Sequence, residues 1–388
     1  MAIRYLTAGE SHGRQLTAIL EGIPAGLPIT EEEINAELER RQHTFGRGER
    51  QQYIEKDAVQ FISGVRFGET LGDPITLVVQ NRDWENWQKI MSIKAEDKDE
   101  KYLQVRPRPG HADLSGAIKF NRSDTRDILE RASARETAVR TAVGTVCRKL
   151  LSEFGVRIYG WVREIGDIKA KIPTDAPQKI WERAQKSPVL CPDEKAGLEM
   201  MDEIQKAKKA GDTMGGIYEV VVTGLPVGVG THTQWDLKLD ARIAQGIMSI
   251  QAHKGVEIGN GFDLARKKGS EVHDEIFYKE GRGFYRETNN AGGLEGGMTN
   301  GEPLVVRAAL KPLASLRKPL HSVHLKTKEA LRAEIVRSDV APVAAATVIG
   351  ESVVAIAVAQ CFVEKFGGDS LREMKDNFDR YVDYVRKF

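Results

Sequence analysis

Residues 106–113 read Arg-Pro-Arg-Pro-Gly-His-Ala-Asp, and residues 133–136 read Ser-Ala-Arg-Glu. The two prolines of the first run fix the backbone and push the residue before each of them toward extended geometry, so this run is not a helix. The second run has the S-x-x-E pattern of a capping box, which predicts a helix start. Apolar residues recur behind it at three- and four-residue spacing, and Gly155 can end the helix.

Arginines gather around this predicted helix start. Between Arg106 and Arg140 the chain has seven arginines and one histidine. A helix N-terminus presents free backbone N–H groups and the positive end of the helix dipole, both of which suit an anion. A solvated basic helix face explains any single arginine equally well, but many of these lie beside glycine and proline. We therefore predict a pocket for phosphates or carboxylates.

The composition is that of a globular protein with a sizeable core. The chain has 388 residues, of which 41% are hydrophobic and 29% charged, which allows two to three domains or one large α/β unit. The net charge of +1 does not indicate bulk binding to nucleic acid or a membrane surface. The three cysteines suit a reducing cytosol. The first residues lack the apolar run of a signal peptide, and the apolar run 353–359 is too short to span a bilayer, so we expect a cytoplasmic protein.

Periodicity predicts the regular elements. Strands are expected at residues 4–8, 16–21, 59–63, 76–80, 218–223 and 304–310, and helices at 194–210, 237–250, 342–366 and 370–388. Thr30 and Glu33 form a second capping box, and Asp339 is an ordinary N-cap candidate for the helix that follows it. Residues 167–192 are punctuated by proline and predict a surface insertion.

Two motifs suggest chemistry that their context does not support. Residues 9–13 fit the G-x-S-x-G nucleophile elbow around Ser11, but a strand and not a helix is expected to follow, which argues against a serine hydrolase. His12 then remains as a polar group in a glycine-flanked loop that a ligand could approach. His321 and His324 would point to opposite faces of a strand, so we expect no metal site.

Two further segments leave alternatives open. Residues 40–50 hold four arginines and either clamp an anionic ligand or form a disordered basic loop. Residues 289–301 hold five glycines but match neither a dinucleotide-binding fingerprint nor a P-loop. Their backbone amides could press against a flat or phosphorylated ligand, or the segment could be a bare hairpin.

The quoted runs resemble a known family. Residues 9–24, 131–137 and 337–352 resemble the three signature regions of chorismate synthase, and residues 106–113 resemble that family's RPGHAD element. The resemblance covers essentially the whole chain. It implies a reduced-FMN-dependent lyase of the shikimate pathway that converts 5-enolpyruvylshikimate 3-phosphate to chorismate by 1,4-elimination. It also implies an α/β (α+β) fold, a β-α-β sandwich with antiparallel sheets packed between helices in a single large domain (1–388), assembled as a homotetramer. Some relatives reduce the flavin with NADPH.

The resemblance also implies residue roles. Proton transfer is assigned to His12, His111 and Asp339. Substrate binding is assigned to Arg41, Arg47, Arg50, Arg108 and Arg135. The flavin would contact Arg131, Ala132, Ser133, Gln251, Ala252, Gly296, Lys311, Pro312, Leu313, Ala314, Ser315 and Arg337. Arginine suits oxyanions because its fork binds them through two hydrogen bonds and keeps its charge.

Two departures from the family pattern are visible. Ala132 stands where many relatives carry serine, and residues 43–45 are bulkier than the expected loop. An RNA-binding module that uses the basic loops is the rival interpretation, but few aromatic residues, among them Phe45 and Phe120, accompany the arginines.

Overall fold

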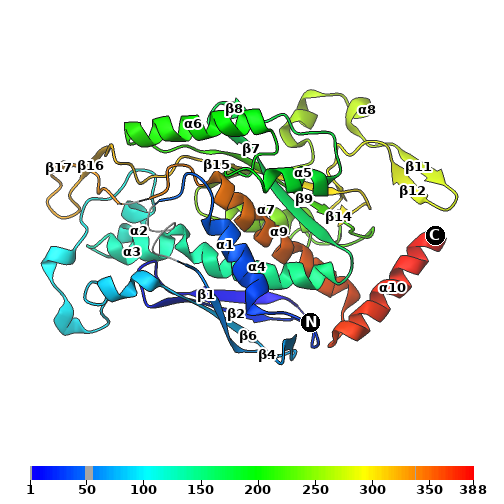
Figure 1. The fold of residues 1–388 in the computed structure, drawn as a ribbon, viewed down its shortest axis with the longest axis horizontal. Coiled ribbons are helices and arrows are strands. Elements are labelled where there is room, and N and C mark those ends of the chain that lie inside the picture. Colours follow the sequence, from blue (N-terminus) through cyan, green and yellow to red (C-terminus); the bar gives the residue numbers. More distant parts are fainter. Residues whose placement is uncertain (1, 49–55, 337) are drawn as a thin grey trace.

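Two antiparallel sheets enclose a layer of helices (Figure 1). The computed structural model describes residues 2–48, 56–336 and 338–388. In spatial order, the first sheet contains β1 (Arg4–Ala8), β2 (Gln15–Glu21), β6 (Ile75–Gln80) and β3 (Val59–Ser63). The second contains β10 (His253–Ile258), β15 (Leu304–Leu310), β9 (Gly216–Thr223), β7 (Arg157–Ile165) and β8 (Ile168–Lys169).

The helices of the middle layer contact both sheets. They are α1 (Glu31–Gln42), α4 (Thr137–Ser152), α7 (Leu239–Met248) and α9 (Val343–Phe366). Helix α4 packs on β2 and β6, α9 packs on β7 and β9, and the two helices pack on each other. The predicted α/β class and β-α-β sandwich are therefore confirmed. The four helices lie between the two sheets, and α5 packs on the other face of the second sheet, so that this sheet is packed between helices.

The remaining elements decorate this sandwich. They include α2 (Asp113–Lys119), α3 (Arg126–Ala132), α5 (Pro177–Ala184), α6 (Glu194–Ala210), α10 (Leu371–Lys387) and the hairpins β11–β12 (Ile276–Lys279, Gly283–Arg286) and β16–β17 (His321–Val323, Ala330–Arg332). Helices α2 and α3 and the β16–β17 hairpin lie at one end of the molecule, and α10 and β11–β12 at the other (Figure 1).

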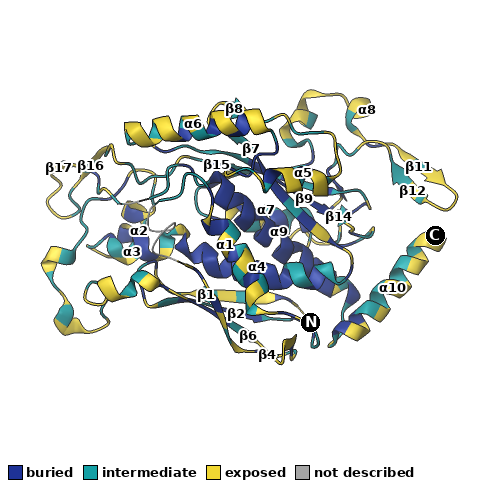
Figure 2. Ribbon diagram, in the orientation of Figure 1, coloured by how far each residue is buried: buried dark blue, intermediate teal, exposed yellow. Residues whose placement is uncertain are grey.

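Helix α9 is the centre of the core. By length and composition alone it could cross a membrane. This differs from the expectation based on residues 353–359, because the apolar helix extends well beyond that run. However, 94% of its most apolar window is buried against the rest of the chain. The dark blue ribbon in the middle of Figure 2 shows the same burial. Its apolar surface therefore serves the protein core.

The predicted strands and helices are present, with bounds that agree with the prediction to within two residues. The helix 194–210 and the strands 4–8, 59–63 and 304–310 have the predicted bounds, and the capping box of Thr30 and Glu33 is present. At the capping box predicted for residues 133–136, Ser133 caps a single 3-10 turn that precedes α4, and Glu136 does not close the box.

Two predicted features differ in the structure. Asp339 does not cap α9, because that helix begins at Val343 and Pro342 holds the cap position. Residues 167–192 contain β8 and α5 where the sequence suggested an irregular surface insertion. Ile180 and Ala184 of α5 are buried against Trp161, so the segment covers the outer face of the second sheet.

Helices α4 and α9 approach closely at a glycine. A Cβ atom added to Gly144 of α4 would lie 2.4 Å from Cβ and 2.6 Å from Cα of Ser352 in α9. Such distances are far below van der Waals contact, so only glycine allows this approach. Gly350 plays the same part against the ring of Tyr218 in β9, where an added Cβ would lie 2.4 Å from a ring carbon.

This contact predicts the effect of a single methyl group. Gly144→Ala should lower the free energy of unfolding by about 1–3 kcal/mol, because α9 must shift away from α4. Gly197→Ala in α6 is the matched control, since its new Cβ meets a serine hydroxyl at 3.3 Å. The control should be neutral or stabilising by up to about 1 kcal/mol from helix propensity. Urea unfolding of the three proteins makes the comparison, and equal stability of Gly144→Ala and wild type would contradict it.

Candidate active site

His12 is held by a carboxylate that the sequence analysis did not select. The loop between β1 and β2 folds against α3, where Ser11 N donates to the backbone oxygen of Glu130 (3.0 Å). The Nδ1 atom of His12 lies 3.0 Å from both carboxylate oxygens of Glu130, and its backbone N donates to the same carboxylate (2.8 Å). The imidazole also stacks on Trp87, with ring centroids 3.8 Å apart. These contacts fix both the place and the orientation of the ring.

The end of α3 lies on the same loop. Arg131 donates to the backbone oxygen of Thr7 (2.9 Å) and to its hydroxyl (2.7 Å), and Ser133 donates to the hydroxyl of Ser11 (3.1 Å). Ala132 lies between these two residues. Strand β2 follows Ser11 where a nucleophile elbow requires a helix, which agrees with the rejection of the hydrolase interpretation.

Two predicted arginines are buried around one aspartate. The side chains of Arg41 and Arg135 are each 2% exposed, and that of Asp57 is fully buried between them. Arg135 Nη1 donates to one oxygen of Asp57 (2.6 Å), and Arg41 Nη1 donates to the other (3.3 Å). Asp57 was missed because nothing in its sequence surroundings links it to either arginine.

The charge around Arg41 favours an additional anion. Burial lowers the pKa of Arg41, and repulsion from Arg47 and Arg135 lowers it further, whereas Asp57 and Asp339 act in the opposite direction without restoring the ordinary value. An arginine stays protonated at neutral pH even when its pKa is lowered. The lowered pKa therefore means that the buried positive charge of Arg41 lies in unfavourable surroundings. A phosphate or carboxylate beside Arg41 would relieve it.

Asp339 anchors the arginine-bearing loop that follows α1. Its carboxylate accepts from Gly48 N (2.7 Å) and from the guanidinium of Arg47. The neighbouring Val340 N donates to the backbone oxygen of Gly46 (2.8 Å). The described part of this loop is therefore docked on residues 338–340, which favours the clamp interpretation over a disordered loop for residues 43–48. Arg50 and Arg337 lie outside the described residues.

A second histidine is held in the same way as the first. His111 Nδ1 contacts Asp113, which is 1% exposed and also receives Nε (2.8 Å) and Nη2 (3.1 Å) of Arg108. Burial alone would raise the pKa of Asp113, but hydrogen bonds from His111 and Arg108 outweigh it and hold the pKa well below its usual range. Arg108 Nη1 also donates to the hydroxyl of Ser315 (2.7 Å).

The predicted flavin segments meet beside this histidine. The ammonium group of Lys311 donates to Gly110 O, and Lys311 N donates to the backbone oxygen of Ala252 (3.0 Å). Ala252 has a left-handed φ of +66°. The Oε1 atom of Gln251 is buried and has no hydrogen-bond partner among the described residues. Because buried polar atoms are normally satisfied, this acceptor indicates a ligand with an N–H or O–H group.

His253 fixes the backbone next to Gln251. Its Nδ1 lies 3.1 Å from the backbone oxygen of Gln251, and its Nε2 lies 2.8 Å from the hydroxyl of Tyr218. The carbonyl can only accept, so Nδ1 carries the proton and Nε2 accepts from Tyr218. Burial lowers the pKa of His253 to about 4. This histidine is therefore a neutral structural group.

Hydrogen bonds join these residues into two groups. The side chain of Asn81 accepts from Arg135 Nε (2.9 Å) and donates to the backbone oxygen of Gly13 (2.7 Å), which connects the arginines to the His12 loop. The hydroxyl of Ser338 donates to the backbone oxygen of Ser315 (2.9 Å), which connects Asp339 to the His111 side. Arg47 and Asp339 act on the charge of Arg41, so the two groups lie near each other at the start of α4.

Gly296 is the exception among the described residues. It lies in the β13–β14 hairpin (Leu294–Glu295, Met298–Thr299), whose Gly297 O accepts from Leu239 N at the start of α7. The end of α7, where Ser249 accepts from Arg140 (2.7 Å), is about 15 Å away along the helix. Figure 1 also places β14 away from α2 and α3. Within one chain, Gly296 does not join the other predicted flavin residues.

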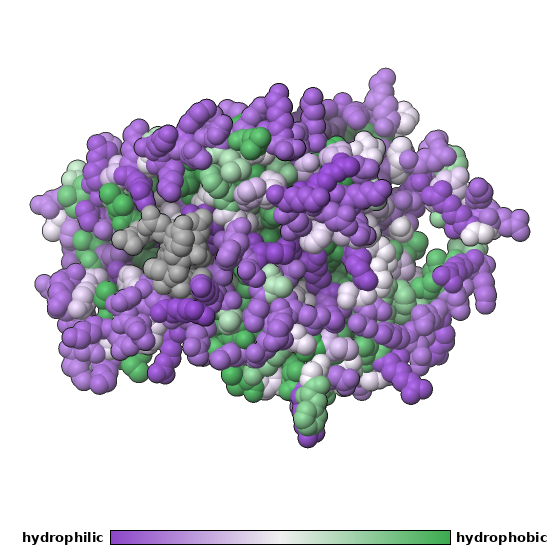
Figure 3. Space-filling view, in the orientation of Figure 1, coloured by the Kyte–Doolittle hydropathy of each residue, from purple (hydrophilic) through white to green (hydrophobic). Residues whose placement is uncertain are grey.

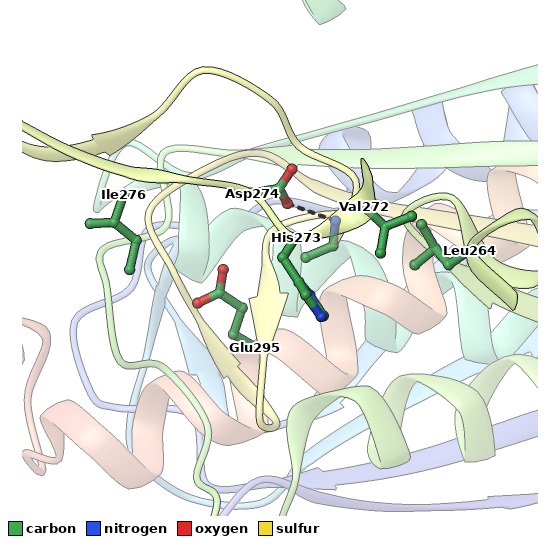
Figure 4. A pocket seen from close by; sticks show the side chains of 7 residues that line it. Leu264, Val272, His273, Asp274, Ile276 and Glu295 are labelled. Carbon is green, nitrogen blue, oxygen red and sulfur yellow. Dashed lines mark hydrogen bonds between the residues drawn. The ribbon is translucent and has the colours of Figure 1, made fainter. Parts of the chain in front are cut away.

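The structure also has a cavity that lies apart from this region. It has a volume of about 370 Å³ and lies beside the β13–β14 hairpin (Figure 4). It is lined by Leu264, Val272, His273, Asp274, Ile276, Ala291 and Glu295, with no arginine or lysine among them. The carboxylate of Asp274 accepts hydrogen bonds from the backbone N–H groups of Asn290 (2.8 Å) and Ala291 (2.9 Å). Within the described ranges, no group of three or more side chains could hold a metal ion.

The buried His253 predicts a pH dependence of stability. Its ordinary pKa is about 6.5, so between pH 6.5 and 4 the unfolded chain takes up a proton that the folded chain refuses. Stability should therefore fall as the pH is lowered through this window, by about 3 kcal/mol in total for this group. His253→Gln should lose the part of this slope between pH 7 and 5, measured by urea unfolding. The exposed His273→Gln is the control, and a slope unchanged in His253→Gln would contradict the assignment.

Comparison with known proteins agrees with this geometry. The family model described as chorismate synthase matches residues 3–363. Chorismate synthases of Geobacter metallireducens and Aquifex aeolicus are 58% and 52% identical to the chain, covering all of it and 100% and 99% of their own lengths. A solved structure described as a crystal structure of chorismate synthase matches with a TM-score of 0.81 and 45% identity, covering 100% of this chain and 99% of the other. The chain therefore belongs to the chorismate synthase family.

Proposed function

We propose that the arginine- and histidine-lined region at the start of α4 is the place where this member of the family converts 5-enolpyruvylshikimate 3-phosphate to chorismate. The observation that carries the proposal is the pair of buried arginines around Asp57, with Arg47 nearby, in surroundings that favour an added anion. The substrate is a phosphorylated dicarboxylate, and Arg41, Arg47, Arg50, Arg108 and Arg135 would bind its phosphate and carboxylate groups. Buried guanidinium groups suit a small anion better than the backbone of an RNA chain, which binds to exposed charges.

The reaction needs two proton transfers on different sides of the substrate. The bond from carbon to the phosphate oxygen breaks, a ring C–H bond breaks, and a new double bond forms. His12 would donate a proton to the departing phosphate, His111 would lie beside the flavin, and Asp339 would help to carry the ring proton away. The carboxylate contacts of both histidines support these roles, because they orient each ring through Nδ1.

The family uses reduced FMN, and the residues present fit this group. The unpartnered acceptor on Gln251, the left-handed backbone at Ala252 and the amine of Lys311 offer contacts to a polar, anionic cofactor. Arg131, Ser133, Arg337 and residues 312–315 would complete them, whereas Gly296 has no support within one chain. Reduced flavin takes part without a net change of redox state. We further propose that NADPH can serve as the reductant that supplies it.

Assembly as a homotetramer in the cytoplasm is part of the proposal. The outer face of the first sheet exposes Leu6 (64%), Ile19 (43%) and Ile62 (63%). Apolar patches are visible over this sheet in Figure 3. Contiguous exposed apolar surface is typical of subunit interfaces. Light scattering on the purified protein should give four times the chain mass, and a monomer would contradict this part.

The experiment that tests the function is a flavin spectrum. The purified protein with FMN and dithionite should show a change in the reduced-flavin absorbance when 5-enolpyruvylshikimate 3-phosphate is added, followed by formation of chorismate. Arg135→Met is the matched variant that removes the buried charge with little change in volume, and it should lose the response to substrate. A spectrum insensitive to substrate in the folded wild type would overturn the proposed site.

The two histidines give a sharper prediction. His12→Ala and His111→Ala should each slow turnover by about two to four orders of magnitude, because each removes a group positioned for proton transfer. Turnover is measured with pre-reduced FMN, and circular dichroism checks that both variants fold. His324→Ala is the control outside the arginine region. Turnover like that of wild type in both variants would sink the assignment.

Asp339 distinguishes proton transfer from loop anchoring. Asparagine can still accept from Gly48 N but cannot take up a proton or attract Arg47 as a carboxylate does. If Asp339 moves a proton, Asp339→Asn should lower kcat at least about tenfold with pre-reduced FMN and leave substrate affinity nearly unchanged. If it only anchors the loop, the variant should resemble Arg47→Ala, with a raised KM and a kept kcat. We predict the first pattern, and the second would return Asp339 to a structural role.

A further inference from the structure

Glu130 is a buried carboxylate with several partners at the His12 loop. It is 4% exposed and lies on α3, and it contacts His12 through Nδ1 (3.0 Å to each oxygen) and through the backbone N (2.8 Å). Arg126, one helical turn earlier, donates to the same carboxylate (3.2 Å). A carboxylate placed in this way acts on the ring and on the loop at once.

The arrangement repeats at the second histidine. Asp113 is bound by His111 and Arg108 in the way that Glu130 is bound by His12 and Arg126. In each case a buried carboxylate meets Nδ1 of the histidine and an arginine at the same time. The two trios come from different parts of the chain, so the shared geometry indicates a common requirement of the two rings.

Glu130 is ionised at neutral pH. Burial on its own would raise the pKa of Glu130, but the hydrogen bonds and charge of His12, with Arg126, outweigh it and lower the pKa below its ordinary value. An ionised carboxylate only accepts, so His12 Nδ1 must carry a proton and donate it. The carboxylate and the stacked ring of Trp87 together hold the imidazole in one orientation. The proposed role of His12 as proton donor would then use Nε2.

We propose that Glu130 is a positioning residue for His12, which fixes the tautomer and the orientation of the ring. This inference rests on the proposed role of His12 as proton donor. Glu130 itself does not exchange the substrate's proton, because His12 lies between them in the proposed arrangement. Its effect should therefore appear only where His12 is present.

The test is Glu130→Gln, which keeps the size of the side chain and loses its charge. We expect kcat to fall about 10- to 100-fold, as for other groups that orient a functional histidine, while KM changes little. A role in folding alone would not separate kcat from KM in this way. Asp127→Asn on the same helix is the matched control, since Asp127 is exposed and pairs with Arg122 away from the loop. It should keep the kcat and KM of wild type.

A double variant separates positioning from a general structural role. In a His12→Ala background, Glu130→Gln should cost no further activity, because the group it acts through is gone. A further loss in that background, or a wild-type kcat for the single variant, would overturn the inference. If Glu130→Gln does not fold, Glu130→Asp, which keeps the carboxylate, should fold and show a reduced kcat with a KM like that of wild type. A wild-type kcat for Glu130→Asp in that case would count against the inference.

The experiments distinguish a failure of the proposed function from a failure of the positioning role of Glu130. Full activity of His12→Ala would remove His12 from the chemistry whatever Glu130 does. An inactive His12→Ala with an unaffected Glu130→Gln would leave the proposed function standing and reject only the positioning role. All rates are taken with pre-reduced FMN at saturating concentration, so that flavin reduction does not limit them.

Discussion

The close approach of α4 and α9 at Gly144 sets the geometry on which the rest of the molecule depends. No side chain separates the helices there, and Gly350 brings α9 equally near to Tyr218 of β9. Each helix can then cover its own sheet while packing on the other, which gives the three-layer order. Because α4 begins two residues after Arg135, the same contact also places the arginines. The position of the site is therefore a consequence of core packing.

Two adjacent arginines are both buried, but their charged neighbours differ. Arg40 and Arg41 both leave α1 toward the interior, and burial lowers the pKa of each. At Arg40 the carboxylates of Glu351 and Glu37 outweigh burial and raise the pKa above its usual range. At Arg41 the neighbouring Arg47 adds to the effect of burial, and the pKa stays lowered. The first arginine completes a buried ion-pair network, whereas the carboxylates of Asp57 and Asp339, the two that act on the second in the described part of the chain, do not offset its burial and the neighbouring arginines.

The sequence identified the charged groups of the site but not their partners. Arginines and histidines beside glycine and proline stand out in a linear pattern, and so do helices and strands with strong periodicity. Asp57 and Glu130 look like any other acid, because their contacts arise only when segments 78 and 118 residues apart meet. Asp113 lies in the same short run as its partners Arg108 and His111, but the sequence does not show that their side chains meet. For Asp339 the sequence pattern predicted a contact that the structure does not have. An acid before an apolar helix predicts a cap, yet Pro342 occupies the cap and Asp339 turns back to the Arg47 loop.

The carboxylates also prepare the arginines to bind. Arg108 uses Nε, Nη1 and Nη2 for Asp113 and Ser315, which holds the plane of its guanidinium and, among the described residues, engages three of its five N–H donors with oxygen acceptors. The remaining donors keep a fixed direction, so a bound anion would not have to order a flexible side chain. The same contacts hold His111 beside Arg108, with Nη2 and Nδ1 3.0 Å apart. At Asp113 the proposed anion-binding arginine and the proposed proton-transfer histidine therefore depend on the same carboxylate, and a change of Asp113 should affect both.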